Sequence, residues 1–173
     1  MKLIVTGYAQ HGKDTVCEIL RDKYGFSFES SSRILLDEVI FPVLAPKYGY
    51  ASKDECFADR INHRQEWFDL LVAYNTPNSS RLGALIFSKY DIYCGLRNRN
   101  ELLAMKEAGL FDYLVWVDAK ERTRTTEPST SMTIIPELDA DFVLDNNGSK
   151  TELVGNIAVM VGYLFNMKCE API

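Results

Sequence analysis

Apolar residues follow two kinds of pattern along the chain, which predict short buried strands separated by helices. Short apolar runs without alternation are typical of strands that are buried on both faces. They predict strands at residues 2–6, 26–28, 91–94, 113–118 and 141–145. Apolar residues at helical spacing predict helices over residues 14–24, 29–39, 55–74, 80–90 and 100–108, and a last helix after the turn at 146–148.

Helix-ending and helix-starting residues set the expected boundaries. Pro42 should close the helix over residues 29–39, because the residue before a proline disfavours helical conformation. Residues 45–54 contain proline and glycine and are expected to form an irregular loop. Ser149 and Glu152 have the spacing of a capping box, which predicts the start of the last helix.

Composition limits the classes of protein that fit. A chain of 173 residues is long enough for one domain with a full core, and 47% hydrophobic and 25% charged residues are ordinary for a soluble globular protein. A net charge of −5 and a pI of about 5.1 argue against binding to nucleic acid polymers, which needs a basic surface. Small nucleotides need only a local cluster of arginine and lysine, so they remain candidate ligands.

Cysteine spacing and hydropathy indicate a location. The four cysteines form no CxxC pair and no metal-type spacing with the two histidines: Cys17, Cys56, Cys94, Cys169, His11 and His63. We interpret them as reduced thiols of an intracellular protein. No apolar run approaches membrane-spanning length, and the chain starts with a strand pattern rather than a signal peptide. We therefore expect a cytoplasmic protein (in the host cell if the chain is viral) with no membrane partner, and a homodimer is left open.

The stretch from Gly7 to Thr15, Gly-Tyr-Ala-Gln-His-Gly-Lys-Asp-Thr, has the form of a phosphate-binding loop, and we call it the glycine loop. It lies between a predicted strand and a helix, where backbone N–H groups could turn around a phosphate. Lys13 would reach the outer phosphates, and Thr15 would serve Mg²⁺ or phosphate. Asp14 stands where the usual pattern has serine or threonine. A glycine-rich turn with a surface lysine is the alternative.

Arginines cluster on the predicted helix over residues 55–74. Arg60 and Arg64 are neighbours on one side of it, with Trp67 three residues further on. The opposite, apolar side is expected to carry Ile61, Phe68, Leu71 and Val72. Arginine beside an aromatic ring suits the binding of a phosphate and a base, and a solvated helix face is the alternative. Arg33, after a serine-rich turn, has the same two interpretations: an anion ligand or a solvated arginine.

Gly95-Leu96-Arg97, which we call the Gly95 turn, follows the strand predicted at 91–94. In an open parallel sheet ligands bind beyond the carboxyl ends of the strands, where Gly95 permits close approach and Arg97 would project. A plain strand-to-helix turn with an exposed arginine is the alternative.

Residues 119–131 are polar and rich in threonine, and they include Lys120, Arg122 and Arg124. This composition favours a mobile or partly helical lid that brings arginines over transferring phosphates. A loop without function is the alternative.

Three of these motifs resemble those of the phosphate-loop nucleoside and nucleotide kinases, above all the phage-type deoxynucleoside monophosphate kinases and the related dephospho-coenzyme A kinases. The Gly-Lys-Asp-Thr end of the glycine loop is similar to the deoxynucleotide kinase loop. The Gly95 turn is similar to a turn of the monophosphate kinases whose arginine holds the acceptor's phosphate. The run from Ala140 to Gly148, with Leu153 beyond, resembles the ending of the dephospho-coenzyme A kinases.

The resemblance implies one kinase domain over residues 1–173, with an α/β fold of three layers. Its parallel five-stranded sheet would have the order 2-3-1-4-5 with helices on both faces. An acceptor-binding helical region would span about residues 30–90, and a short lid about 119–131. ATP would bind at Gly7, Gly12, Lys13, Asp14, Thr15, Asn146, Asn147 and Gly148. By position, the acceptor would bind at Arg33, Arg60, Arg64, Trp67 and Arg97, with catalysis by Lys13, Arg97, Arg122 and Arg124, and with Mg²⁺ at Thr15.

The implied reaction is the ATP-dependent phosphorylation of a (deoxy)nucleoside monophosphate to the diphosphate. An anionic acceptor needs no general base, and Trp67 or Tyr50 would stack its base. Cys94 stands where adenylate kinases have an aspartate that helps organise Mg²⁺, so the ion would rely on Thr15, phosphates and water, or on a carboxylate such as Asp14. One alternative is a dephospho-coenzyme A kinase, whose hydroxyl acceptor needs a general base. Another is a nucleotide-binding regulator that transfers nothing, against which the acceptor-side arginines argue.

Overall fold

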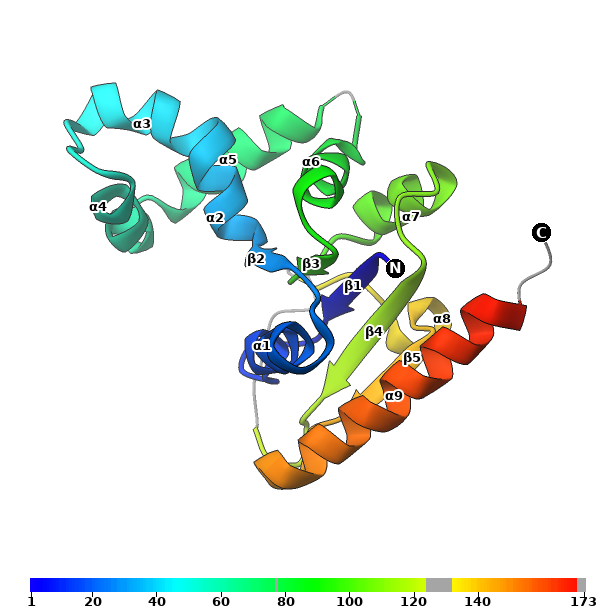
Figure 1. The fold of residues 1–173 in the computed structure, drawn as a ribbon. Helices are drawn as coiled ribbons and strands as arrows, with labels where there is room; N and C mark the ends of the chain where they lie inside the picture. The colour runs from blue at the N-terminus through cyan, green and yellow to red at the C-terminus, as the bar shows by residue number, and fades with distance from the viewer. Residues whose placement is uncertain (77, 124–131, 171–173) are drawn as a thin grey trace.

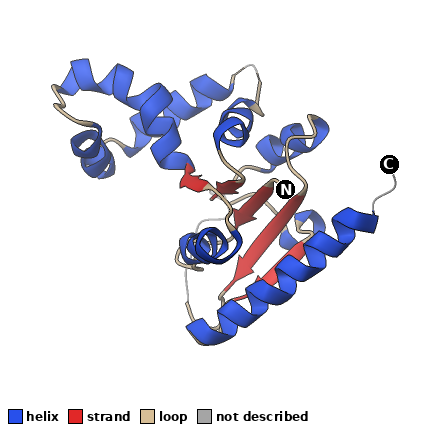
Figure 2. Ribbon diagram, viewed as in Figure 1, coloured by secondary structure: helices blue, strands red, loops and turns tan. Residues whose placement is uncertain are grey.

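The computed structural model describes residues 1–76, 78–123 and 132–170. Five strands in these residues form one parallel sheet with the order β2–β3–β1–β4–β5, which confirms the predicted order. Figures 1 and 2 show this sheet with helices around it. The strands are β1 (Leu3–Thr6), β2 (Phe28–Ser30), β3 (Ile92–Cys94), β4 (Tyr113–Asp118) and β5 (Phe142–Asp145).

Helices cover both faces of the sheet. They are α1 (Lys13–Tyr24), α2 (Ser31–Leu35), α3 (Phe41–Tyr48), α4 (Lys53–Ala58), α5 (Arg64–Asn75), α6 (Arg81–Lys89), α7 (Arg99–Glu107), α8 (Pro136–Asp139) and α9 (Lys150–Glu170), with a π-helical turn at Leu36–Ile40 and a 3₁₀ turn at Asp59–Ile61. Leu3 and Val5 of β1 pack with α1 and α9 on one face, whereas Ile4 packs with α2, α6 and α7 on the other. Burial on both faces explains why β1 is an unbroken apolar run.

The helix predicted over residues 29–39 does not end at Pro42, and that prediction was wrong. Helical structure runs from α2 through the π-helical turn into α3, which ends only at Tyr48, inside the predicted loop. In the π-helical turn the Phe41 N–H reaches back to the Leu36 carbonyl. The wider turn places Pro42 at the junction with α3, in the first turn of that helix.

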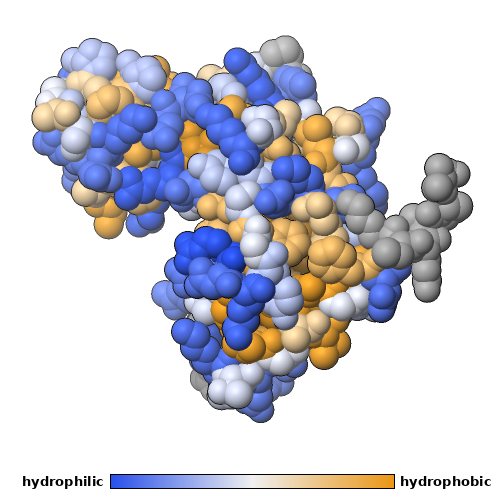
Figure 3. Space-filling model, in the orientation of Figure 1, coloured by the Kyte–Doolittle hydropathy of each residue, from blue (hydrophilic) through white to orange (hydrophobic). Residues whose placement is uncertain are grey.

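The single helix predicted over residues 55–74 is broken into α4, the 3₁₀ turn and α5. Asp59 causes the break by drawing in three donors: the Tyr50 hydroxyl (2.5 Å), the Asn62 amide (2.6 Å) and the His63 ring (3.1 Å). The chain therefore restarts α5 in a new orientation. These helices form a lobe that projects beyond the β2 edge of the sheet in Figure 1, and its surface mixes hydrophilic and hydrophobic residues in Figure 3.

The break also changes the side of several residues of this segment from the one predicted. Trp67, expected on the polar side, is only 8% exposed and belongs to the core. Ile61, Phe68 and Val72, expected on the apolar side, are exposed. Leu71, also expected on the apolar side, does pack against the core. A periodicity counted through a break therefore misplaces some of the residues beyond it.

Two smaller differences concern β2 and α8. β2 begins at Phe28, two residues later than predicted, because Phe26 still takes part in the C-terminal cap of α1, its N–H donating to the Leu20 carbonyl. The short helix α8 was not predicted. The capping box at Ser149 and Glu152 is confirmed by hydrogen bonds in both directions between these residues.

A carboxyl group is buried between β3 and α7. Glu101 is 7% exposed, and the Tyr93 hydroxyl donates to its Oε1 atom (2.9 Å). Burial raises the pKa of Glu101 to about 7, because the charged form loses its hydration, and the Tyr93 hydrogen bond opposes this shift without cancelling it.

The raised pKa of Glu101 predicts that this residue weakens the fold as pH rises. The folded state keeps the proton at pH values where the unfolded chain has lost it, so its contribution is fully present below the unfolded pKa and is lost toward pH 7. Glu101→Gln keeps an acceptor oxygen for Tyr93 and should remove this loss. We expect its free energy of unfolding near pH 8 to exceed that of the parent protein by on the order of 2–3 kcal/mol, with a much smaller gain near pH 5.

Urea unfolding at the two pH values measures this difference. Glu107→Gln on the exposed side of the same helix is the matched control and should behave like the parent protein. An unchanged pH dependence in Glu101→Gln would contradict the assignment.

Candidate active site

The glycine loop requires glycine at two positions. Gly7 has a φ of +147°, and a Cβ atom built on it would lie 2.4 Å from the Val117 carbonyl oxygen of β4. Gly12 has a φ of +88°, and its Cβ would lie 2.4 Å from the side-chain nitrogen of Asn146. Only glycine lets the loop lie this close to β4 and to the turn after β5.

The first turn of α1 brings Lys13, Asp14 and Thr15 to this loop. The Lys13 ammonium donates to the Tyr8 carbonyl oxygen (2.7 Å), so the side chain spans the loop. The Asp14 carboxylate accepts a hydrogen bond from the thiol of Cys94 at the end of β3 (3.5 Å). The free N–H groups of the first helical turn add partial positive charge. A lysine, helix N–H groups and a glycine-shaped backbone together suit a polyphosphate.

His11 and Asn146 tie the glycine loop to the neighbouring strands. The buried His11 ring accepts a hydrogen bond at Nδ1 from the Ala119 N–H (3.0 Å), and because an N–H can only donate, the neutral ring carries its proton on Nε2. The Val117 carbonyl oxygen, 3.2 Å from the same Nδ1, is then a close contact. The buried Asn146 amide donates to the His11 carbonyl oxygen (2.8 Å). The role of His11 could not be predicted from the sequence, because no local pattern marks a structural histidine.

The turn after β5, predicted to contact ATP, lies against this side of the loop. Besides the Asn146 bond, the Asn147 side chain accepts a hydrogen bond from the Glu121 N–H (2.8 Å), and Gly148 follows in the same turn. The side chains of both asparagines are thus occupied in bracing the site. Their contact with ATP stays a prediction.

Arg122 lies at the same place. Its Nε donates to the Asn146 carbonyl oxygen (3.1 Å), and its guanidinium lies near Gly12. The structure therefore brings one of the two predicted lid arginines to the glycine loop. Arg124 and the rest of the predicted lid, residues 124–131, lie outside the described residues.

The Gly95 turn is bonded directly to the end of β1. The Gly95 N–H donates to the Val5 carbonyl (2.9 Å), and the Thr6 hydroxyl donates to the Leu96 carbonyl. Gly95 has a φ of +92°, which a side chain would strain. Arg97 follows, half-buried, and its carbonyl accepts a hydrogen bond from the Thr133 N–H (3.0 Å). The structure thus places Arg97 beside the glycine loop at the carboxyl edge of the sheet.

An open pocket of about 610 Å³ lies in the helical lobe, and we call it the arginine pocket. It is lined by Ser32, Phe57, Ala58, Arg60, Ile61, Arg64 and Trp67. Three predicted acceptor residues, Arg60, Arg64 and Trp67, therefore meet in one place although they do not share one helix. The small exposed area of Trp67 and its ring contact with Phe57 (centroids 6.0 Å apart) make it a wall of the pocket rather than a projecting ring.

Phe57 is the aromatic residue that the sequence analysis missed. The guanidinium carbons of Arg33 and Arg60 lie 3.9 Å and 4.3 Å from its ring centroid. Its position three residues before Arg60 could have indicated this contact. Tyr50, the other predicted stacking residue, does not line the pocket; its hydroxyl donates to Asp59, and burial raises its pKa.

The arginines in and beside the arginine pocket are only partly paired with carboxylates. Arg33 pairs with Asp54 (2.6 Å). Within the described part of the chain, no carboxylate forms an ion pair with Arg60 or Arg64. Two guanidinium groups with apolar and aromatic walls form a site for a flat or partly apolar anion.

Two serines at the start of α2 link the arginine pocket to the Gly95 turn. Ser31 Oγ lies 3.9 Å from the Cβ position of Gly95, and Ser32 lines the pocket. The start of α2 thus contacts the Gly95 turn through one serine and the pocket through the next.

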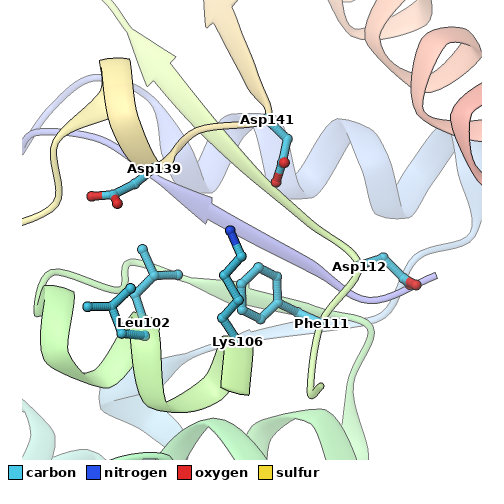
Figure 4. Close-up of a pocket in the computed structure, with 7 residues that line it drawn as sticks. Leu102, Lys106, Phe111, Asp112, Asp139 and Asp141 are labelled. Carbon is cyan, nitrogen blue, oxygen red and sulfur yellow. The ribbon is translucent and has the colours of Figure 1, made fainter. Parts of the chain in front are cut away.

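A second cleft, of about 100 Å³, lies at the opposite, amino-terminal edge of β4 and β5 (Figure 4). In Figure 4 Lys106 points from α7 toward the segment that carries Asp139 and Asp141. Both oxygens of the Asp139 carboxylate share the Nε–H of Arg99 (3.0 Å and 2.8 Å), and Asp141 accepts a hydrogen bond from the Leu114 N–H (2.7 Å). These carboxylates serve the fold, and the cleft is separate from the glycine loop.

Metal-binding clusters and membrane-spanning helices are both absent from the described residues. Residues 1–76, 78–123 and 132–170 contain no group of three histidine, cysteine or acidic side chains that could hold a metal ion. None of the helices in this part of the chain is long and apolar enough to cross a membrane.

Comparison with known proteins identifies the fold. No protein-family model and no curated protein matches the chain. Among solved structures, a gluconokinase from Sinorhizobium meliloti 1021 matches with a TM-score of 0.54 and 17% identity, over 99% of this chain and 97% of the gluconokinase. TT1252 from Thermus thermophilus matches with a TM-score of 0.53 and 18% identity, over 94% and 96% of the two chains. A shikimate kinase from Aquifex aeolicus matches with a TM-score of 0.51 and 16% identity, over 94% and 96%.

The chain has the fold of the P-loop kinases. In this P-loop kinase fold the glycine loop lies between β1 and α1, and the Gly95 turn follows β3. Identities of 16–18% show the fold alone and leave the substrate open.

The bracing role of Asn146 predicts a strong effect of Asn146→Asp. The substitution keeps the size of the side chain but turns a carboxylate oxygen toward the His11 carbonyl in a buried place. We expect the free energy of unfolding to fall by about 1–3 kcal/mol and the affinity for ATP to fall with it.

Asn156→Asp is the matched control, because the Asn156 amide also donates to a backbone carbonyl, that of Asp145 (3.0 Å), at an exposed site. It should cost less than about 1 kcal/mol. Urea unfolding and titration with ATP measure both variants, and equal losses in the two would contradict a bracing role.

Proposed function

We propose that the chain transfers the γ-phosphate of ATP to the phosphate of a (deoxy)nucleoside monophosphate, giving the diphosphate. The observation that carries this proposal is the presence of two separate cationic sites at one edge of the sheet. The glycine loop with Lys13 suits the donor, and the arginine pocket beside the Gly95 turn suits an anionic acceptor. A protein that only binds a nucleotide needs no second site.

On the donor side, the protein positions the phosphates of ATP and neutralises their charge. The N–H groups of the glycine loop and the Lys13 ammonium hold the β- and γ-phosphates of ATP. Asn146, Asn147, Gly148 and Arg122 border the loop on the side proposed for the adenosine. Arg122, or Arg124 outside the described residues, closes over the transferred group.

The acceptor side binds a phosphate and a planar base. Arg97, with one or both of Arg60 and Arg64, holds the acceptor phosphate in line with the γ-phosphate. The apolar and aromatic walls of the pocket, with Arg33 stacked on Phe57, suit the base. The acceptor oxygen is already anionic, so it attacks phosphorus without a general base.

Residues at the loop also fit Mg²⁺. The Thr15 hydroxyl and the Asp14 carboxylate are oxygen ligands of the kind that a hard cation prefers, and Mg²⁺ on nucleotides is held largely by phosphates and water. When bound, the ion neutralises charge on the donor phosphates.

A kinase with a different small acceptor is the second candidate. Its support is the likeness to structures named gluconokinase and shikimate kinase, together with a pocket whose arginines would also bind a carboxylate. A hydroxyl acceptor, as in a dephospho-coenzyme A kinase, would also need a general base near the glycine loop.

An acceptor panel tests the proposal. The panel holds nucleoside and deoxynucleoside monophosphates, dephospho-coenzyme A, gluconate and shikimate, each assayed with ATP and Mg²⁺ for ADP release. We expect release above the acceptor-free rate with at least one monophosphate and with none of the other compounds. Lys13→Ala should lower that rate by about a thousandfold while keeping the circular dichroism of the parent protein.

ADP release with dephospho-coenzyme A, gluconate or shikimate, and with no monophosphate, would contradict the proposed acceptor and identify a different one. Binding of ATP without ADP release for any compound would favour the alternative of a nucleotide-binding regulator that transfers no phosphate.

Arg64→Ala tests the arginine pocket. Loss of a charge-assisted contact to the acceptor should raise the KM for the monophosphate by about 10- to 100-fold and leave the KM for ATP near the parent value. Arg81→Ala is the control, since Arg81 stacks on Tyr74 (4.1 Å) on a different helix and does not line the pocket. Equal effects of the two variants, or an effect of Arg64→Ala on ATP alone, would contradict the acceptor site.

A further inference from the structure

Two carboxylates, Asp14 and Asp118, lie next to the glycine loop. Asp118 ends β4, and Asp14 follows Lys13 in the first turn of α1. A carboxylate beside bound polyphosphate repels it unless a cation lies between them. Each carboxylate is therefore either neutralised within the protein or available to a cation.

Asp118 has polar and cationic partners within the protein. Its Oδ1 accepts a hydrogen bond from the Lys120 N–H (3.2 Å), and its Oδ2 lies 3.4 Å from the Lys120 ammonium. The His11 ring lies 3.9 Å away. Asp118 thus already has a cationic partner in Lys120.

Asp14 forms no ion pair with any of the described residues. It is exposed, and within the described residues the Cys94 thiol is the group that hydrogen-bonds it. A thiol is a weak donor, and one contact leaves most of the lone pairs of the carboxylate open.

The Cys94 contact also fixes where the carboxylate lies. It holds the Asp14 side chain at the carboxyl end of β3, between the glycine loop and the Gly95 turn. In the proposed reaction this place lies between the phosphates of the donor and the phosphate of the acceptor. Thr15, the next residue of the same helical turn, adds a hydroxyl.

We propose that Asp14 is the carboxylate that binds the divalent cation of the bound nucleotide, either directly or through a water molecule. This role rests on the proposed function only in that the glycine loop binds ATP. The residue after the loop lysine then serves the cation from α1, and the thiol of Cys94 positions it from β3.

Nucleotide binding without any acceptor tests this role. The affinity for ATP is measured by calorimetry with Mg²⁺ and with chelator, for the parent protein, Asp14→Asn and Asp118→Asn. Asp14→Asn keeps an oxygen for the Cys94 thiol and removes only the charge. We expect it to bind metal-free ATP more tightly than the parent protein, because a repulsive charge is gone, and to lose about tenfold or more of the gain that Mg²⁺ provides.

A cation ligand and a structural residue are expected to differ in this experiment. Loss of a cation ligand strengthens the binding of metal-free ATP and weakens the effect of Mg²⁺, whereas loss of a structural residue would weaken the binding of ATP with and without Mg²⁺ alike. Binding of Mn²⁺ with ATP, followed by electron paramagnetic resonance, should weaken in Asp14→Asn and persist in Asp118→Asn. The double variant Asp14→Asn with Cys94→Asp moves the carboxylate to the neighbouring strand and should restore part of the Mg²⁺ gain.

An undiminished Mg²⁺ gain in Asp14→Asn would overturn the assignment, and so would a loss confined to Asp118→Asn. If the parent protein binds Mg²⁺ and ATP but phosphorylates no acceptor, the proposed function fails and the role of Asp14 is still decided by these titrations. If it binds no ATP under either condition, both proposals fail.

Discussion

The candidate active site depends on direct backbone contact between the glycine loop and the ends of the neighbouring strands. The Val117 carbonyl lies where a side chain on Gly7 would have to be, and the Gly95 N–H and the Thr6 hydroxyl close the other side of the joint. Parallel strands end at one edge of the sheet, so this joint gathers segments that are far apart in the sequence. A side chain on Gly7 would push the loop away from the backbone of β4.

The contacts between the glycine loop and the neighbouring strands bring cationic groups together in an otherwise acidic protein. The chain carries a net charge of −5, yet Lys13, Arg97 and the arginine pocket lie around one end of the sheet. The uneven distribution matters more for recognition than the net charge, because phosphate groups respond to the nearest guanidinium and N–H groups. The same reasoning singles out Asp14, since an exposed carboxylate among such groups repels phosphate unless a cation joins the site.

The sequence predicted the features that local patterns encode. Five strands, their order and the glycine loop follow from short apolar runs, glycine spacing and a resemblance carried by three motifs. Contacts between distant residues could not be predicted. Asp59 breaks a helix by gathering Tyr50, Asn62 and His63, which exchanges the faces of Trp67 and Phe68. The Asn146 brace joins residues 135 positions apart in the sequence.

Transfer of the γ-phosphate is the central claim, and phosphorus NMR follows it most directly. The spectrum is recorded on the protein with ATP, Mg²⁺ and each monophosphate of the acceptor panel. With the accepted monophosphate, we expect the γ-phosphate signal of ATP to decline while the β-phosphate signal of a new nucleoside diphosphate rises by the same amount. Intact ATP with every monophosphate, or inorganic phosphate as the sole new product, would contradict the transfer.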